Sequence, residues 1–147
     1  MPNPASTAMA EVSITHRARV EEAFHDAWAK SLRVEELLVH ESFESPTAVE
    51  NRFALHALGG PEGLAGKRVL DLGCGAGEAA VFFALHGAHV IAADVSEEML
   101  RVARALAAHH GVKIQTSKVM AEAMPFPDGT FDCVYGNGVL HHVELEP

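Results

Sequence analysis

Two acidic residues and a run of glycines in the middle of the chain could hold one small molecule. Asp71 is followed by a glycine at every second position in the stretch "VLDLGCGAG", and Asp94 ends the next apolar stretch, "VIAAD". Glycine there costs conformational entropy, so we expect a bound group to come close to that backbone. An ionised carboxylate such as that of Asp94 is a natural acceptor for a pair of neighbouring hydroxyl groups.

The spacing of the glycines separates two classes of cofactor. Dinucleotide-binding turns favour G-x-G-x-x-G, because a pyrophosphate rests on the N-terminus of the following helix. Here the glycines are Gly73, Gly75 and Gly77, and the third position after Gly75 is Glu78. A carboxylate at that point would repel a pyrophosphate. The spacing therefore disfavours an NAD-linked oxidoreductase.

The elements around these residues follow a regular alternation. Short apolar stretches predict strands and longer periodic stretches predict helices, in the order 68–73 (strand), 78–87 (helix), 88–95 (strand), 96–111 (helix), 112–119 (strand) and 131–138 (strand). Strands that alternate with helices of this length form a parallel sheet through right-handed crossovers. We therefore predict an α/β, doubly wound, mostly parallel Rossmann-like sheet, whose ligands bind at the carboxyl ends of the strands.

The chain before the sheet reads as helical. Residues 1–13 are interpreted as a disordered tail, 14–60 as a helical lid or cap, and 61–147 as the cofactor-binding domain. Phe24 and Trp28 belong to the apolar face of the first helix, and the lid hypothesis places His25 or Trp28 near the transferred group. Thr47 with Glu50 fits a capping box. Another helix is expected to begin at the N-cap Ser96.

Three stretches in order resemble the class I S-adenosylmethionine (SAM)-dependent methyltransferases, and most closely their small-molecule members of the ubiquinone/menaquinone-biosynthesis type. They are "VLDLGCGAG", "VIAADVSEEML" and "AEAMPFPDGTFDCVYGNGVLHHV". The resemblance covers roughly residues 67–143, and it implies SAM as cofactor and a small-molecule acceptor. It also implies strands in the order 3-2-1-4. The segment after the fourth strand lacks the N/D-P-P-Y/F motif of enzymes that methylate exocyclic amines of nucleic acids.

The resemblance also implies roles for individual residues. Asp71 would contact the methionyl ammonium group and Asp94 the ribose hydroxyls. Val95 and Met99 would pack on the adenine, although Met99 fits the core equally well. The other cofactor-binding residues that it implies are Gly73, Cys74, Gly75, Gly77, Ala121, Glu122, Asn137 and Gly138. Related sequences often carry an acid where Met120 stands, so the resemblance implies either weaker SAM binding than usual or a hydrogen bond from adenine to Glu122 instead.

His141 and His142 follow the fourth strand, where an acceptor is expected. Either histidine could take a proton from the attacking atom or could only shape the pocket. Many methyl transfers need no strong base, since alignment supplies most of the acceleration. The histidines lack the spacing of a metal site, so no metal is expected.

Net charge, the length of apolar runs and the cysteines limit the expected classes of partner and compartment. The formal charge of −9 argues against nucleic acid, and no apolar run approaches the length of a membrane span. The two cysteines, Cys74 and Cys133, lack metal-type spacing and fit a reducing, cytoplasmic compartment.

The chain ends after the fourth expected strand, whereas a full domain of the resembled family has seven. We therefore expect a fragment of a longer methyltransferase, or a homodimer that pairs through the exposed edge of strand 131–138. A non-catalytic SAM-binding or dimerisation module is the main alternative, because the acceptor half is absent.

Overall fold

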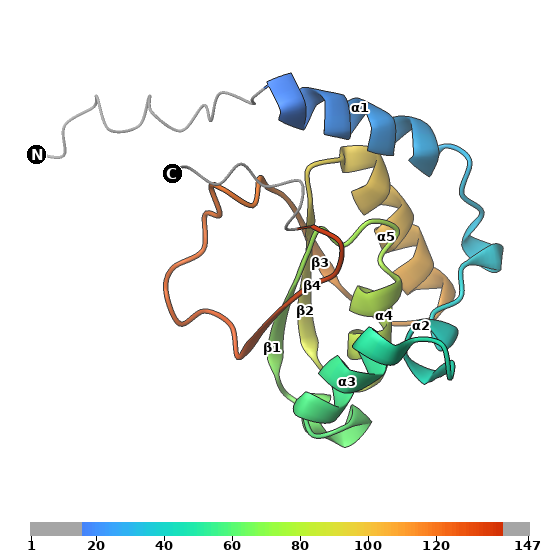
Figure 1. Cartoon of the computed structure of the whole chain (residues 1–147), viewed down its shortest axis with the longest axis vertical. Coiled ribbons are helices and arrows are strands. Elements are labelled where there is room, and N and C mark those ends of the chain that lie inside the picture. The colour runs from blue at the N-terminus through green and yellow to red at the C-terminus, as the bar shows by residue number, and fades with distance from the viewer. Residues whose placement is uncertain (1–15, 140–147) are drawn as a thin grey trace, which may run out of the picture.

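The computed structural model describes residues 16–139, which form one parallel sheet with helices before and between its strands (Figure 1). His141, His142 and the predicted tail 1–13 lie outside the described residues. The elements in chain order are α1 (His16–Ala29), η3 (Val34–Glu36), α2 (Glu41–Glu44), α3 (Val49–Ala57), η4 (Pro61–Leu64), β1 (Arg68–Leu72), α4 (Glu78–Leu85), β2 (His89–Asp94), α5 (Glu97–His109), β3 (Gln115–Lys118) and β4 (Cys133–Gly136).

The sheet has the predicted topology. Its strands lie in the order β3-β2-β1-β4, and all three pairs are parallel. The predicted fold class and strand order are therefore confirmed. Asp71 of β1 is in register with Tyr135 of β4, so these two side chains lie next to each other on one face. Among the described strands, β4 and β3 are the two edges.

The two faces of the sheet are covered differently. Helices α4 and α5 pack on one face (Figure 1). On the other face, Leu70 and Leu72 form a cluster with Phe126 and Phe131, which come from the segment between β3 and β4. That face is therefore closed by an extended segment in the part of the chain that the structure describes.

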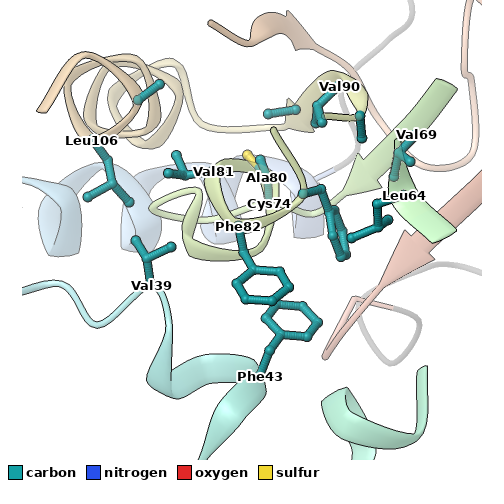
Figure 2. Close-up of a cluster of buried hydrophobic side chains, with 14 of the residues drawn as sticks. Val39, Phe43, Leu64, Val69, Cys74, Ala80, Val81, Phe82, Val90 and Leu106 are labelled. Atoms are coloured by element: carbon teal, nitrogen blue, oxygen red, sulfur yellow. The ribbon is translucent and has the colours of Figure 1, made fainter. Parts of the chain in front are cut away.

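A buried aromatic contact joins the N-terminal helices to the sheet domain. The ring of Phe43 in α2 stacks on Phe82 in α4, with centroids 4.4 Å apart and planes 14° apart (Figure 2). Phe43 also meets Phe83 edge-on at 5.2 Å. Burying an aromatic side chain contributes about 2 kcal/mol, and such ring pairs add to it. The contact fixes α2, and with it the start of α3, against the sheet domain.

The two predicted helix starts have different outcomes. Ser96 is the N-cap of α5, and its Oγ accepts a hydrogen bond from Met99 N at 3.1 Å, as predicted. The capping box at Thr47 is wrong, because Ala48 is the N-cap of α3 and no side chain caps it. The hydroxyl of Thr47 instead pairs with that of Ser45 at 2.9 Å. Local turn bonding has replaced the cap.

The first helix packs less tightly than its sequence suggests. Phe24 is 64% exposed and Trp28 49% exposed, and Ala29 is the one residue of α1 that is fully buried. The apolar face of α1 therefore lies partly in solvent. Within residues 16–139, no helix combines the length and apolar character needed to cross a membrane.

Candidate cofactor site

A cavity of about 490 Å³ opens at the carboxyl ends of the strands. This is the position at which open parallel sheets bind ligands, and the volume suits a small molecule. Its walls come from the turn after β1, the end of β2, the segment after β3, the end of β4 and the N-terminal helices. Most of the residues that the sequence singled out line it: Asp71, Gly73, Cys74, Gly75, Asp94, Val95, Ala121, Glu122, Asn137 and Gly138.

The three glycines of the turn have different neighbours. All have positive φ, of +69° at Gly73, +54° at Gly75 and +88° at Gly77. Apart from its chain neighbours, a Cβ added at Gly75 would meet none of the described residues within 4 Å, whereas one at Gly73 would come within 2.7 Å of Val139. At Gly77 it would lie 2.6 Å from Ala103 Cβ. Only Gly75 therefore leaves the backbone open to a ligand, while the other two allow the protein to pack against itself.

The carboxylate of Asp94 is held in a fixed orientation. Its Oδ2 accepts from Gly75 N at 2.9 Å, and its Oδ1 accepts from Ser96 N at 2.9 Å. Asp94 is only 7% exposed. A carboxylate has about four lone-pair sites, so both oxygens keep capacity for hydroxyl donors from the cavity. The two backbone bonds preorganise this carboxylate for a ligand.

Asp71 is a strongly perturbed acidic group in the cavity. It is 2% exposed, and its Oδ2 has no hydrogen-bond partner among the described residues. Burial raises the pKa of Asp71 to about 7, and the charges of Asp94 and Glu78 push it in the same direction, while a backbone hydrogen bond from Ala80 opposes them. A buried carboxyl with an open oxygen points to a donor supplied from outside the described residues.

The wall after β3 holds the residues that the resemblance assigns to the adenine. Met120, Ala121 and Glu122 line the cavity together with Val95 at the end of β2. Met120 is half-buried and offers a thioether and no strong acceptor. Glu122 remains the carboxylate of this wall, as the sequence suggests.

Met99 and Gly77 do not line the cavity. Met99 is fully buried and packs with Ala29, Ala76 and Val102. The side chain of Met99 thus belongs to the contact between α1 and α5, and Gly77 starts α4 next to Ala103. Helical periodicity alone gives no way to distinguish a core position from the adjacent pocket wall.

Helix α1 forms one side of the cavity and is tied to the sheet domain by polar contacts. Ser96 Oγ donates to Asp26 Oδ1 at 2.5 Å, and Lys118 forms an ion pair with Glu22. Both contacts lie beside the end of a strand that borders the cavity. His25 and Trp28 are among the lining residues, together with Ala18 and Glu21.

Sequence reasoning missed a polar cluster at the end of β4. Asn51, Phe43 and Tyr135 line the cavity, and Tyr135 Oη donates to Asn51 Oδ1 at 2.5 Å. Burial raises the pKa of Tyr135. Asn51 and Tyr135 are far apart in the chain, so no local sequence pattern predicts their contact.

An open parallel sheet with buried carboxylates around a glycine turn defines a Rossmann-like, nucleoside-binding α/β domain. Residues 69–147, more than half of the chain, match the family model described as a methyltransferase domain. The chain belongs to this methyltransferase family, and the resemblance to class I SAM-dependent methyltransferases is confirmed.

Individual relatives agree with this assignment. A ubiquinone biosynthesis O-methyltransferase of Sinorhizobium fredii is 41% identical over 83 residues, which cover 56% of this chain and 34% of that protein. The structure of a SAM-dependent methyltransferase from Mesorhizobium loti is 37% identical, with a TM-score of 0.56, and the match covers 67% of this chain and 44% of that one.

A more distant structure shows the shared fold. The magnesium protoporphyrin IX methyltransferase of Synechocystis with bound SAM is 20% identical, with a TM-score of 0.67 over 90% of this chain and 66% of that one. The chain spans about a third of the length of the curated relative from Sinorhizobium.

Proposed function

We propose that this chain is the cofactor-binding part of a SAM-dependent methyltransferase that transfers a methyl group to an oxygen, nitrogen or carbon nucleophile of a small molecule. The observation that carries the proposal is the pair of buried carboxylates, Asp71 and Asp94, on either side of the open turn at Gly75. Family membership and the names of the relatives support it.

The residues of the cavity fit this cofactor. The open Oδ2 of Asp71 would receive the methionyl ammonium group, and Asp94 would accept from the ribose hydroxyls. Gly75 leaves room for a ligand against the main chain. When bound, SAM supplies a methyl group already activated by its sulfonium. The chain then contributes alignment, which is a large part of the acceleration in such transfers.

A dinucleotide fits the same cavity poorly. Glu78 lines it, and its charge acts on Asp71. A pyrophosphate would therefore meet carboxylates where the NAD-binding turn offers backbone N–H groups.

A non-catalytic SAM-binding module is a competing hypothesis. It predicts the same cofactor binding as a methyltransferase but no turnover, so it needs a separate measurement.

Calorimetric titration tests the proposal. We expect the chain to bind SAM and S-adenosylhomocysteine (SAH) and not NADH. Asp94→Asn should lower the affinity for SAM and for SAH by about 10- to 100-fold, because a charge-assisted hydrogen bond is lost. Glu98→Gln is the matched control, since Glu98 lies outside the cavity and pairs with Arg101 on the surface.

Three results would separate the alternatives. Unchanged SAM affinity in Asp94→Asn contradicts the ribose assignment, and tight NADH binding contradicts the cofactor. SAM binding without SAH formation over a broad panel of acceptors favours the non-catalytic module. A general base is not part of this proposal, because His141 and His142 lie outside the described residues.

We also propose that two copies of this chain associate through β4. Among residues 16–139 β4 is an edge strand, and its Val134 is 56% exposed, so its outer side is open to a second strand within the part of the chain that the structure describes. Light scattering should give the mass of a dimer, and Val134→Lys should shift it to a monomer, since charged edge residues oppose pairing. A clean monomer of the unmodified chain at low micromolar concentration contradicts this proposal.

The class of methyl acceptor is inferred from charge, and the cellular compartment from the cysteines. The net charge of −9 and the acidic cavity oppose a nucleic-acid acceptor, so we infer a small molecule. Cys74 and Cys133 are both free, which fits a reducing compartment, and we place the protein in the cytoplasm.

A further inference from the structure

The polar cluster of Asn51, Tyr135 and Asn137 has a defined hydrogen-bond polarity. Asn51 Nδ2 donates to the backbone oxygen of Ser42 at 2.6 Å, which fixes the amide. Asn51 Oδ1 then accepts from Tyr135 Oη and, at 3.1 Å, from Asn137 Nδ2. Asn137 Nδ2 also donates to the Tyr135 oxygen, at 3.3 Å. Because the Tyr135 proton points to Asn51, the oxygen keeps one further lone pair for a donor from the cavity.

Rings and the sheet hold the Tyr135 side chain rigidly. Its ring lies 5.2 Å from that of Phe83 and 5.9 Å from that of Phe43. Tyr135 is also the register neighbour of Asp71, the residue proposed to hold the methionyl end of the cofactor. The phenol oxygen is thus a preorganised acceptor on the cavity wall next to that end.

Acidic side chains outnumber basic ones in the described wall of the cavity. Its wall contains no Lys or Arg among residues 16–139. The acidic residues that line it are Glu21, Asp71, Glu78, Asp94 and Glu122. A carboxylate or phosphate on an incoming molecule would meet like charges at low dielectric, and the basic side chain of the described wall, His25, is already paired with Glu21 at 3.6 Å. The segment before the sheet adds the apolar side chains of Trp28, Leu37 and Phe43 to this wall, beside polar ones such as His25 and Ser42.

We propose that Asn51, Tyr135 and Asn137 form the acceptor-binding cluster of this cavity, and that it selects an uncharged, largely apolar molecule that presents a hydroxyl group. The inference rests on the proposed function. The hydroxyl donates to the Tyr135 oxygen, the apolar wall covers the rest of the molecule, and the carboxylates exclude anionic analogues. Asn51 is a positioning residue, because it acts through the orientation of Tyr135.

Two probes that differ by one carboxylate test this selectivity. Catechol and 3,4-dihydroxybenzoate are titrated into the full chain loaded with SAH. We expect catechol to bind at least tenfold more tightly, because the second probe carries a negative charge into an acidic cavity. Tyr135→Phe should weaken catechol about tenfold, the loss of one hydrogen bond, and leave SAH affinity within about twofold.

A gain of function distinguishes selectivity from a structural role. Asn137→Lys places a cation at the cluster and should reduce or reverse the preference for catechol, which mere destabilisation would not do. Equal binding of both probes, binding of neither probe, or parallel loss of SAH and catechol affinity in Tyr135→Phe overturns the inference. Failure of SAH to bind the unmodified chain instead overturns the proposed function, so the two failures are distinguishable.

Discussion

Replacing Asp71 with asparagine is expected to weaken SAM binding about 10- to 100-fold while making the folded chain more stable at pH 8. The loss of affinity follows from losing a charge-assisted hydrogen bond to the methionyl ammonium group. The gain in stability follows from burial, because an ionised carboxylate at 2% exposure is costly and a neutral amide is much less so. Function and stability therefore oppose each other at this residue.

The pH dependence gives the sign of the stability effect. The pKa of Asp71 is raised from 3.8 to about 7 in the folded chain, chiefly by burial. Its contribution to stability is fully present below pH 3.8 and is lost as the pH rises through about 7. A shift of this size corresponds to about 4 kcal/mol, so Asp71→Asn should gain about 2–4 kcal/mol at pH 8 and little at pH 4.

Urea unfolding at pH 4 and pH 8, with calorimetry of SAM at pH 6 and pH 8, measures both effects. SAM binding by the unmodified chain should weaken as the pH falls below about 7, because only the ionised carboxylate attracts the ammonium group. Asp71→Asn should lose this dependence. An Asp71→Asn chain that binds SAM normally would sink the assignment.

Asp132 provides a control of opposite sign. Its side-chain and backbone hydrogen bonds with Arg68 lower the pKa of Asp132 to about 2. The stability that it contributes is present above 3.8 and lost as the pH falls through about 2. Asp132→Asn should therefore destabilise the chain at pH 8 and leave SAM affinity unchanged, because Asp132 lies outside the cavity.

Much of the fold could be predicted because it depends on local patterns. Apolar stretches that alternate with periodic ones gave the parallel sheet, and Ser96 marked the start of α5. The capping box predicted at Thr47 does not form, because the hydroxyl of Thr47 pairs with that of Ser45, two residues earlier. Short polar side chains bond locally in several ways, and sequence alone does not rank them.

The site was predictable to the extent that it lies in continuous motifs. Asp71, Gly75 and Asp94 come from such motifs, and all three line the cavity. Asn51 and Tyr135 are 84 residues apart, and their hydrogen bond depends on how α3 packs against the end of β4. A contact of this kind is set by tertiary packing, for which the local sequence carries no periodic signal.

Two alanine substitutions in the glycine turn are expected to have opposite main effects, one on SAM affinity and the other on the stability of the fold. Gly75→Ala should fold and lose at least tenfold in SAM affinity, whereas Gly77→Ala should be destabilised by about 3 kcal/mol or more. At Gly75 the new methyl group enters open space, so the folding cost is only that of a left-handed alanine, about 1–2 kcal/mol. At Gly77 it would also lie 2.6 Å from Ala103 Cβ and 3.0 Å from Ala103 Cα.

Thermal or urea unfolding and calorimetry on both variants give the comparison. The folded fraction of Gly77→Ala should keep its affinity, because Gly77 lies outside the cavity wall. Normal SAM binding by Gly75→Ala would mean that the cofactor does not approach this backbone. The entropic cost of Gly75 would then have no functional reason, since among residues 16–139 only its chain neighbours come within 4 Å of the position of its missing side chain.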